Sequence, residues 1–305
     1  MARRYGLVLL FMSPWIVGFG VFILYPMASS LYFSFMRYDM LRPPVPVGVE
    51  NYRLMFTGDP QVWLAIRNTV WLIAVGVPLR IVFGILTAML LTRSRRGVKV
   101  YRTIYFLPSM APPVAAALAF VLVFNPSNGP VNQLLTHLGM KSPPLWFYGP
   151  GSSKWALVAL GLWGVGDAMI IFLAGLLDVP RQLYEAADIE GASALQKFRH
   201  VTLPMISPVV FFSLVIGVIN GFQYFTQAYV ASTVVSGTRN PASTLGSPQG
   251  SLLFYSVYLY QQGFAYFRMG YASAMAWILL LVTLACTLVV IRTSGRWVHY
   301  GGGLR

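Results

Sequence analysis

Charged residues are scarce in this chain. Only 10% of its 305 residues are Asp, Glu, Lys or Arg, and 57% are hydrophobic, whereas soluble domains carry about 25% charged residues. Several apolar runs reach the ~20 residues that a helix needs to cross a bilayer. Because a spanning segment must pair its own backbone groups, and alternating strand segments do not dominate, we expect an all-α polytopic membrane protein. The single cysteine, Cys286, excludes an internal disulfide.

The chain also lacks the signatures of an enzyme. It contains no Gly-x-x-x-x-Gly-Lys-Ser/Thr loop, so we do not expect it to hydrolyse ATP itself. His137, His200 and His299 fall in three separate polar segments, with neither a His-Glu-x-x-His pair nor a Cys/His cluster. We therefore expect no catalytic residue, no metal site and no cofactor held by this chain.

Six apolar runs predict six transmembrane spans in a single transmembrane domain, residues 1–305. For the first run a cleaved signal peptide is the alternative, but the run is too long for a typical signal sequence, so we interpret it as a retained span. Prolines at 108, 112 and 113 interrupt the third run near its start. The expected spans are 6–35, 68–91, 104–124, 155–177, 205–230 and 269–291.

Acidic residues are far fewer than basic ones, 8 against 22, which gives a net charge of +14. In a membrane protein this excess is typical of loops that face the anionic cytoplasmic leaflet, so we expect no nucleic acid partner. Placing both termini in the cytoplasm puts 13 of the 22 basic residues there and eight outside. The segment 181–204 is then cytoplasmic. The densest basic cluster follows the second span and consists of Arg93, Arg95, Arg96, Lys99 and Arg102.

Two charged residues lie inside predicted spans, each near the middle: Arg80 in the second and Asp167 in the fourth. Charges in lipid are costly and face a cavity or a partner. Two interpretations stay open. The residues share a depth and line a polar cavity, or they form an ion pair that locks two helices together.

Small and polar residues share one face of the predicted fifth span. They recur at three- and four-residue spacing, and Asn, Tyr and Gln side chains can hydrogen-bond to hydroxyl groups. Helix packing through small residues is the alternative interpretation. On the fourth span Leu160, Gly164 and Asp167 make a similar row. The fifth-span face consists of Gly217, Asn220, Gly221, Tyr224 and Gln227.

The polar segment before the fifth span carries a motif. Glu185-Ala186-Ala187 is followed by Gly191 and then by Val201-x-Leu203-Pro204. This spacing resembles the EAA loop of permease subunits of ABC-type importers, with Val201 where isoleucine is usual. Other stretches resemble the carbohydrate-uptake permeases related to the maltose and glycerol-phosphate importers, although the extra spans and external domain of the larger maltose-type subunit are missing. These stretches are Glu50-Asn51-Tyr52 with Phe56, Phe106-Leu107-Pro108, residues 124–134 and 270–274.

The resemblance implies a type I ABC importer permease fold and a permease that moves a sugar or oligosaccharide by alternating access in a prokaryotic inner membrane. It also implies partners: a homologous second permease, two ATPase subunits that hold ATP and Mg, an extracellular substrate-binding protein and membrane lipid. An importer of glycerol phosphate or a polyol is the alternative, and an unpaired Arg80 would suit such an anion. A stand-alone secondary transporter or channel is the distant alternative.

The resemblance further assigns roles to residues. The small residues of the motif would let a short helix enter a groove on the ATPase, Gly191 would permit a turn, and Pro204 would open the next span. Sugar contacts in the maltose-type relative come from the fourth and fifth spans. The implied ATPase-coupling residues are Glu185, Ala186, Ala187, Gly191, Leu203 and Pro204. The expected substrate path comprises Arg80, Gly164, Asp167, Gly217, Asn220, Gly221, Tyr224 and Gln227.

Overall fold

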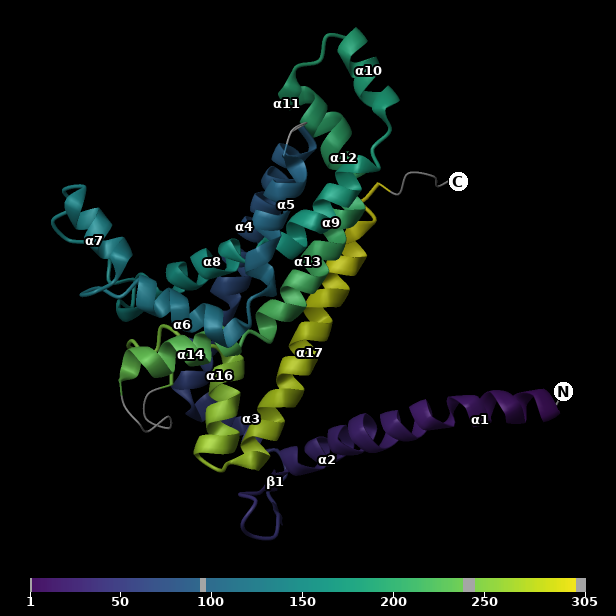
Figure 1. Cartoon of the computed structure of the whole chain (residues 1–305). Helices are drawn as coiled ribbons and strands as arrows, with labels where there is room; N and C mark the ends of the chain where they lie inside the picture. The colour runs from purple at the N-terminus through teal and green to yellow at the C-terminus, as the bar shows by residue number, and fades with distance from the viewer. Residues whose placement is uncertain (1, 94–96, 238–244, 300–305) are drawn as a thin grey trace. The chain divides into compact units, whose positions relative to one another are not determined.

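A computed structural model describes the backbone of residues 2–93, 97–237 and 245–299 (Figure 1). Within these ranges it describes the side chains of all residues except 2–10 and 93. Arg95 and Arg96 of the basic cluster, and residues 238–244 of the last long loop, lie outside this part. The chain divides into two compact units, Met1–Val62 with Leu259–Leu281 and Trp63–Tyr258 with Val282–Arg305. The single domain expected for residues 1–305 stays a prediction.

The first unit begins with a helical run. It comprises α1 (Ala2–Phe19), the π-helical turn η1 (Gly20–Leu24) and α2 (Tyr25–Ser34). Helical backbone angles at Phe19 and Leu24 keep the run continuous, so Phe11–Ser34 is long and apolar enough to cross a membrane. This segment corresponds to the first predicted span.

A hairpin follows α2. In it β1 (Met36–Arg37) pairs antiparallel with β2 (Val45–Pro46). The Asp39 carboxylate closes the turn by accepting the backbone N–H groups of Leu41, at 3.0 Å, and Arg42, at 2.8 Å. The hydrogen bond from the Arg42 N–H is the main cause that lowers the pKa of Asp39.

The Glu50-Asn51-Tyr52 sequence ties α3 (Glu50–Arg53) to the end of α2. The Asn51 amide donates to the carbonyl oxygens of Ser34 and Met36, each at 2.9 Å, and the Tyr52 hydroxyl donates to Ser34 Oγ at 2.8 Å. The turn η2 (Leu54–Gly58) continues from α3, and η6 (Gln261–Ala265) lies later in the same unit. The Glu50-Asn51-Tyr52 motif thus fixes the backbone at the end of α2 and the start of β1.

The second predicted span begins earlier than expected. α4 (Pro60–Arg93) includes residues 60–67, which precede the expected start of the span at residue 68, so the expected start is wrong. The cause is a strong helix start: the Asp59 carboxylate accepts the N–H of Gln61 at 3.0 Å, and Pro60 has no N–H to satisfy. The polar residues Gln61 and Arg67 do not interrupt the helix.

The third and fourth predicted spans are both bent. The third consists of α5 (Val98–Phe106), the 3₁₀ turn η3 (Leu107–Met110) and α6 (Pro113–Val123), with a bend of 98°. The fourth consists of α8 (Ser153–Trp163) and α9 (Gly166–Leu177), with a bend of 51°. Prolines explain the first bend, as the sequence predicts, whereas nothing in the sequence analysis pointed to the second bend.

The fifth predicted span is interrupted as well. It comprises α12 (Leu203–Met205), α13 (Ser207–Phe222) and α14 (Thr226–Ser236), and thus extends beyond the expected end at 230. At the interruption the Phe222 carbonyl accepts a hydrogen bond from Ser256 Oγ at 2.9 Å, which replaces a bond within the helix. Tyr224 therefore lies between two helices, while Ser207–Ser236 as a whole is one segment long and apolar enough to cross a membrane. The sixth span, α17 (Met269–Ser294), is continuous.

Within the described residues, four helices are long and apolar enough to cross a membrane, or six spans when each bent pair counts as one. The remaining helical elements are shorter. They are α7 (Pro130–His137), η4 (Trp146–Tyr148), α10 (Arg181–Ile189), α11 (Ala194–Lys197), η5 (Phe198–Thr202) and α16 (Tyr255–Tyr260).

In the second unit, α9 packs against α5 and α13 (Figure 1). A buried apolar cluster joins α4, α9 and the start of α13 around the fully buried Phe172. Its other buried members are Ile85, Ala88, Leu91, Met169, Leu173, Val179 and Ile206. This cluster fixes α4 against α9.

A polar clamp in the N-terminal part of α4 holds segment 245–255 in place. The buried Asn68 amide donates to the carbonyl oxygens of Gly250, at 2.8 Å, and Leu253, at 2.9 Å. Its own oxygen accepts a hydrogen bond from Lys154 Nζ at 3.1 Å. One side chain thus joins α4, α8 and the segment.

We expect Asn68→Leu to lower the free energy of unfolding by about 2–4 kcal/mol, because it leaves two carbonyls and one ammonium without their partner. Thermal unfolding of the detergent-solubilised full chain measures this loss. Asn128→Leu is the matched control, since Asn128 is exposed. Equal shifts in the two variants would contradict the assignment.

Candidate functional site

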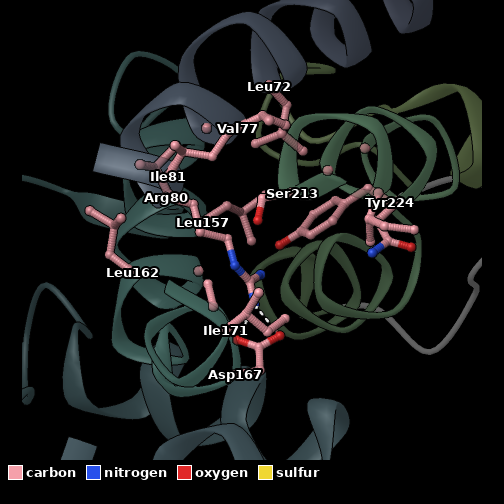
Figure 2. Close-up of a pocket in the computed structure, with 18 of the residues that line it drawn as sticks. Leu72, Val77, Arg80, Ile81, Leu157, Leu162, Asp167, Ile171, Ser213 and Tyr224 are labelled. Atoms are coloured by element: carbon pink, nitrogen blue, oxygen red, sulfur yellow. Dashed lines mark hydrogen bonds and ion pairs between the residues drawn. The ribbon is translucent and has the colours of Figure 1, made fainter. Parts of the chain in front are cut away.

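A cavity of about 180 Å³ lies within the second unit, lined by α4, α8, α9 and α13 (Figure 2). Most of its lining is aliphatic. Polar groups come from Arg80 on α4, Asp167 on α9, Ser213 and Asn220 on α13, and Tyr224 just after α13. In Figure 2 the Tyr224 hydroxyl points toward the Arg80 guanidinium. The cavity thus combines aliphatic walls with a few convergent polar groups, as small-molecule sites do.

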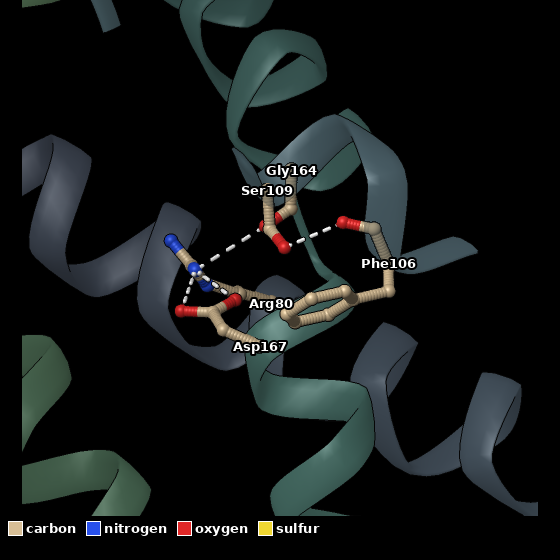
Figure 3. A network of polar contacts seen from close by, with 5 residues as sticks. All are labelled: Arg80, Phe106, Ser109, Gly164 and Asp167. Carbon is tan, nitrogen blue, oxygen red and sulfur yellow. Dashed lines mark hydrogen bonds and ion pairs between the residues drawn. The ribbon is translucent and has the colours of Figure 1, made fainter. Parts of the chain in front are cut away.

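Arg80 and Asp167 form an ion pair in this cavity (Figure 3). Arg80 Nη2 lies 2.6 Å from Asp167 Oδ1 and 2.8 Å from Oδ2, and 3.4 Å from the carbonyl oxygen of Gly164. The predicted contact between the two charges is therefore confirmed. Both residues also line the cavity, so the two interpretations hold together, while a role in the substrate path stays a prediction.

The break between α8 and α9 creates this geometry. Since α8 ends at Trp163, the Gly164 carbonyl is available to Arg80, and Asp167 falls in the first turn of α9. Free N–H groups at a helix N-terminus favour a carboxylate there. The bend between α8 and α9, which the sequence did not predict, thus positions Asp167, whose charge inside the span the sequence did show.

The 3₁₀ turn η3 packs closely behind the break. A Cβ atom on Gly166 would lie 2.5 Å from the carbonyl oxygen of Tyr105 and 2.7 Å from Phe106 Cα, so the backbones of α5 and α9 touch here. Ser109 Oγ donates to the Phe106 carbonyl at 2.7 Å and closes the turn beside Gly164 (Figure 3). The end of α5 and the turn η3 therefore hold the Asp167 side of the cavity.

The predicted fifth-span face has two functions in the structure. Cβ atoms on Gly217 and Gly221 would come within 2.6 Å of Val77 and 2.5 Å of Ile73 on α4, so these glycines allow close packing. They also line the cavity together with Asn220 and Tyr224.

Sequence reasoning missed Ser213 and did not foresee where Gln227 lies. Ser213 precedes Gly217 by four residues, so the same helical spacing could have identified it. Gln227 is in α14, beyond the interruption, and is not part of the cavity lining. In the described part of the chain, no three His, Cys, Asp or Glu side chains come together as a metal site requires.

The Glu185–Pro204 segment forms a preorganised loop, with α10 and α11 together at one end of the unit (Figure 1). Gly191 has φ of 74° and ends α10. Its N–H donates to the Asp188 carbonyl at 3.1 Å, and the Ala192 N–H donates to the Ala187 carbonyl at 2.9 Å. This pair of bonds is a Schellman motif, which requires a left-handed residue at the position of Gly191.

Further contacts make the loop rigid. Ser193 and Gln196 form a capping box at α11. Lys197 Nζ lies 2.5 Å from Asp188 Oδ1, which ties α11 to α10. Leu203 and Pro204 form the start of α12, Leu203 being exposed and Pro204 half-buried.

The outer surface of the loop is apolar at its tip. Ile189 is 89% exposed and Leu195 is 75% exposed. The motif residues Glu185 and Ala186 are exposed on α10 as well, and Ala187 is half-buried. A rigid loop with exposed aliphatic side chains is suited to docking against another protein.

Comparisons with known proteins agree on one group. Residues 80–296 match the family described as binding-protein-dependent transport system inner membrane component. A probable ABC transporter permease protein, YesP of Bacillus subtilis (strain 168), is 40% identical over 291 residues, which cover 95% of this chain and 91% of YesP. The arabinooligosaccharides transport system permease protein AraP of the same organism is 34% identical over 293 residues, or 94% and 88% of the two chains.

One solved structure is similar over nearly the whole chain. It is the crystal structure of a bacterial ABC transporter involved in the import of the acidic polysaccharide alginate. One of its chains superposes with a TM-score of 0.80 at 24% identity, covering 96% of each chain. At this identity the likeness shows the fold.

Proposed function

The chain belongs to the family of binding-protein-dependent transport system inner membrane components, and from this premise we propose that it is the permease subunit of an ATP-driven importer of a sugar or oligosaccharide. Its fold is that of a type I ABC importer permease, as predicted. The observation that carries the proposal is the cavity on α4, α9 and α13, whose helices lead to the preorganised loop.

The chemistry of the cavity suits hydroxyl groups. Arg80 and Asp167 present a donor and an acceptor next to each other, which matches two neighbouring hydroxyls of a sugar. Asn220, Ser213 and Tyr224 add groups that both donate and accept, among aliphatic walls that fit the apolar faces of a pyranose ring. The names of the relatives, AraP among them, support a saccharide.

The proposed assembly supplies what this chain does not. Two ATPase subunits would hold ATP and Mg, a homologous second permease would complete the path, and an external binding protein would deliver the solute. The alginate transporter has been crystallised with a pentasaccharide-bound periplasmic protein, which supports the last partner. We place the chain in a prokaryotic inner membrane, with both termini in the cytoplasm, in line with its basic residues.

The proposed mechanism is alternating access. Closure of the ATPases would push on the α10–α11 loop. Because Lys197–Asp188 and the buried cluster around Phe172 make stiff connections, α9 and α13 would move with the loop. These helices carry Asp167 and Asn220, so the cavity would open to the other side. ATP hydrolysis would restore the inward-facing state.

Specific contacts in the structure argue against the two alternative functions. A glycerol-phosphate importer suits an unpaired Arg80, whereas Arg80 is paired with Asp167. A stand-alone transporter or channel leaves the exposed Ile189 and Leu195 of a rigid loop without a function.

Proteoliposomes with the complete complex test the proposal. We expect labelled arabinotriose, presented with its binding protein, to accumulate only when ATP is hydrolysed. A complex with a catalytically inactive ATPase is the control and should bind the sugar without accumulating it. Accumulation by this chain alone, driven by an ion gradient, would overturn the assignment.

A further inference from the structure

The charge balance of the cavity bears on which sugars it accepts. Among the described residues that line it, only Arg80 and Asp167 carry charge, and they face each other at 2.6 Å. Their side chains are 41% and 56% exposed, so both are accessible from the cavity. This chain's share of the site is therefore neutral, while it still presents both a cation and an anion.

Only one of the three guanidinium nitrogens of Arg80 forms hydrogen bonds to the described residues. Nη2 contacts both oxygens of Asp167 and the carbonyl of Gly164, whereas Nη1 and Nε have no hydrogen-bond partner among the described residues. Figure 2 shows the guanidinium on the side of the cavity where the Tyr224 hydroxyl points inward. Arg80 can thus donate to sugar hydroxyls without releasing Asp167.

Asp167 is not easily displaced by a second carboxylate. It lies in the first turn of α9, where helix N–H groups favour its charge, and both of its oxygens contact Arg80. A uronate that reached Arg80 would stand next to Asp167, in a cavity whose aliphatic walls weaken screening. Repulsion between two unit charges at such separations is large enough to decide between ligands.

We propose that the Arg80–Asp167 ion pair acts as a charge filter, through which this cavity accepts uncharged saccharides and rejects acidic ones of the same shape. Asp167 is the specificity-determining residue. Its negative charge cancels the attraction of Arg80 for a ligand carboxylate, while the Arg80 N–H groups stay available to donate to sugar hydroxyls. This inference rests on the proposed sugar function and names the class of sugar.

Binding of a matched ligand pair to the full chain in lipid nanodiscs tests the filter without the binding protein. Galactobiose and digalacturonate differ in the carboxyl groups, and calorimetry at pH 7 and low salt gives the two Kd values. We expect the wild type to favour galactobiose. In Asp167→Asn the Kd ratio should shift roughly 10- to 100-fold toward digalacturonate, as an unbalanced charge a few ångströms from the ligand implies.

Arg80→Gln should shift the ratio in the opposite direction, and Arg80→Gln/Asp167→Asn should return it close to the wild-type value. The double variant separates charge from misfolding, because a merely structural ion pair would leave it as damaged as the single variants. A wild-type preference for digalacturonate, or a ratio that no variant changes, would overturn the filter alone. Failure of the wild type to bind either sugar would instead count against the sugar function itself.

Discussion

Ile189→Asp combined with Leu195→Asp is expected to abolish ATP-driven uptake. The two side chains are 89% and 75% exposed on the loop, so the change adds two carboxylates to the proposed docking surface and removes no buried contact. Central apolar contacts of an interface cost at least about 2 kcal/mol each when they are lost, which predicts a more than ~100-fold weaker association with the ATPase. Co-purification of the ATPase and uptake into proteoliposomes measure the effect.

A matched control exists on α7. Leu134, on α7, and Leu138, directly after it, are also exposed leucines, 60% and 75%, in a segment that the proposed orientation places outside the cell. Leu134→Asp with Leu138→Asp should leave co-purification of the ATPase unchanged, and both double variants should still bind sugar. If the α7 variant loses the ATPase equally, or the loop variant keeps it, the docking surface lies elsewhere.

The shape of the loop should matter as much as its apolar tip. Proline cannot adopt the φ of 74° that Gly191 has, and it lacks the N–H that donates to Asp188. Gly191→Pro should therefore also release the ATPase while the cavity keeps its sugar affinity. Loss of sugar binding along with the ATPase would mean that the loop supports the fold rather than the coupling.

The features of this molecule that sequence predicted best depend on local chemistry. Long apolar runs, the prolines of the third span and Gly191 of the Glu185–Pro204 segment each restrict the backbone within a few residues. The contact between Arg80 and Asp167 was also predictable, because two charges at similar depth in lipid have few other partners. Asp59-Pro60 is an equally local helix start, and it could have placed the beginning of α4 correctly.

Features that depend on distant contacts were not predictable. The fifth span is interrupted after Phe222, whose carbonyl bonds to Ser256, 34 residues later in the chain. The bend at Gly164 likewise has no proline to signal it. Its carbonyl is instead bonded by Arg80, from another helix. A prediction from periodicity assumes that the backbone hydrogen bonds of each helix form within that helix. It fails where a side chain of another element bonds to a backbone carbonyl instead.

Gly166→Ala is the second change from which we expect a large effect. The new Cβ would lie 2.5 Å from the Tyr105 carbonyl oxygen and 2.7 Å from Phe106 Cα. These are backbone atoms at the end of α5 that cannot rotate away, so the start of α9 must move away from α5. Overpacking of this kind costs about 1–3 kcal/mol. Asp167 is the next residue, so the same movement should weaken its contact with Arg80.

Gly164→Ala, at the same break between α8 and α9, is the control that separates the steric clash from the mere addition of a methyl group. Its Cβ would meet nothing closer than 3.9 Å and φ is −86°, so alanine fits there without strain. We expect Gly164→Ala to keep the wild-type melting temperature and galactobiose affinity, and Gly166→Ala to lose at least tenfold in affinity with a lower melting temperature. Because α9 lies between the cavity and the 181–204 segment that we propose as the ATPase-docking loop, a displaced α9 should also reduce sugar-stimulated ATP hydrolysis. Equal behaviour of the two variants would show that the contact between the end of α5 and the start of α9 does not position Asp167.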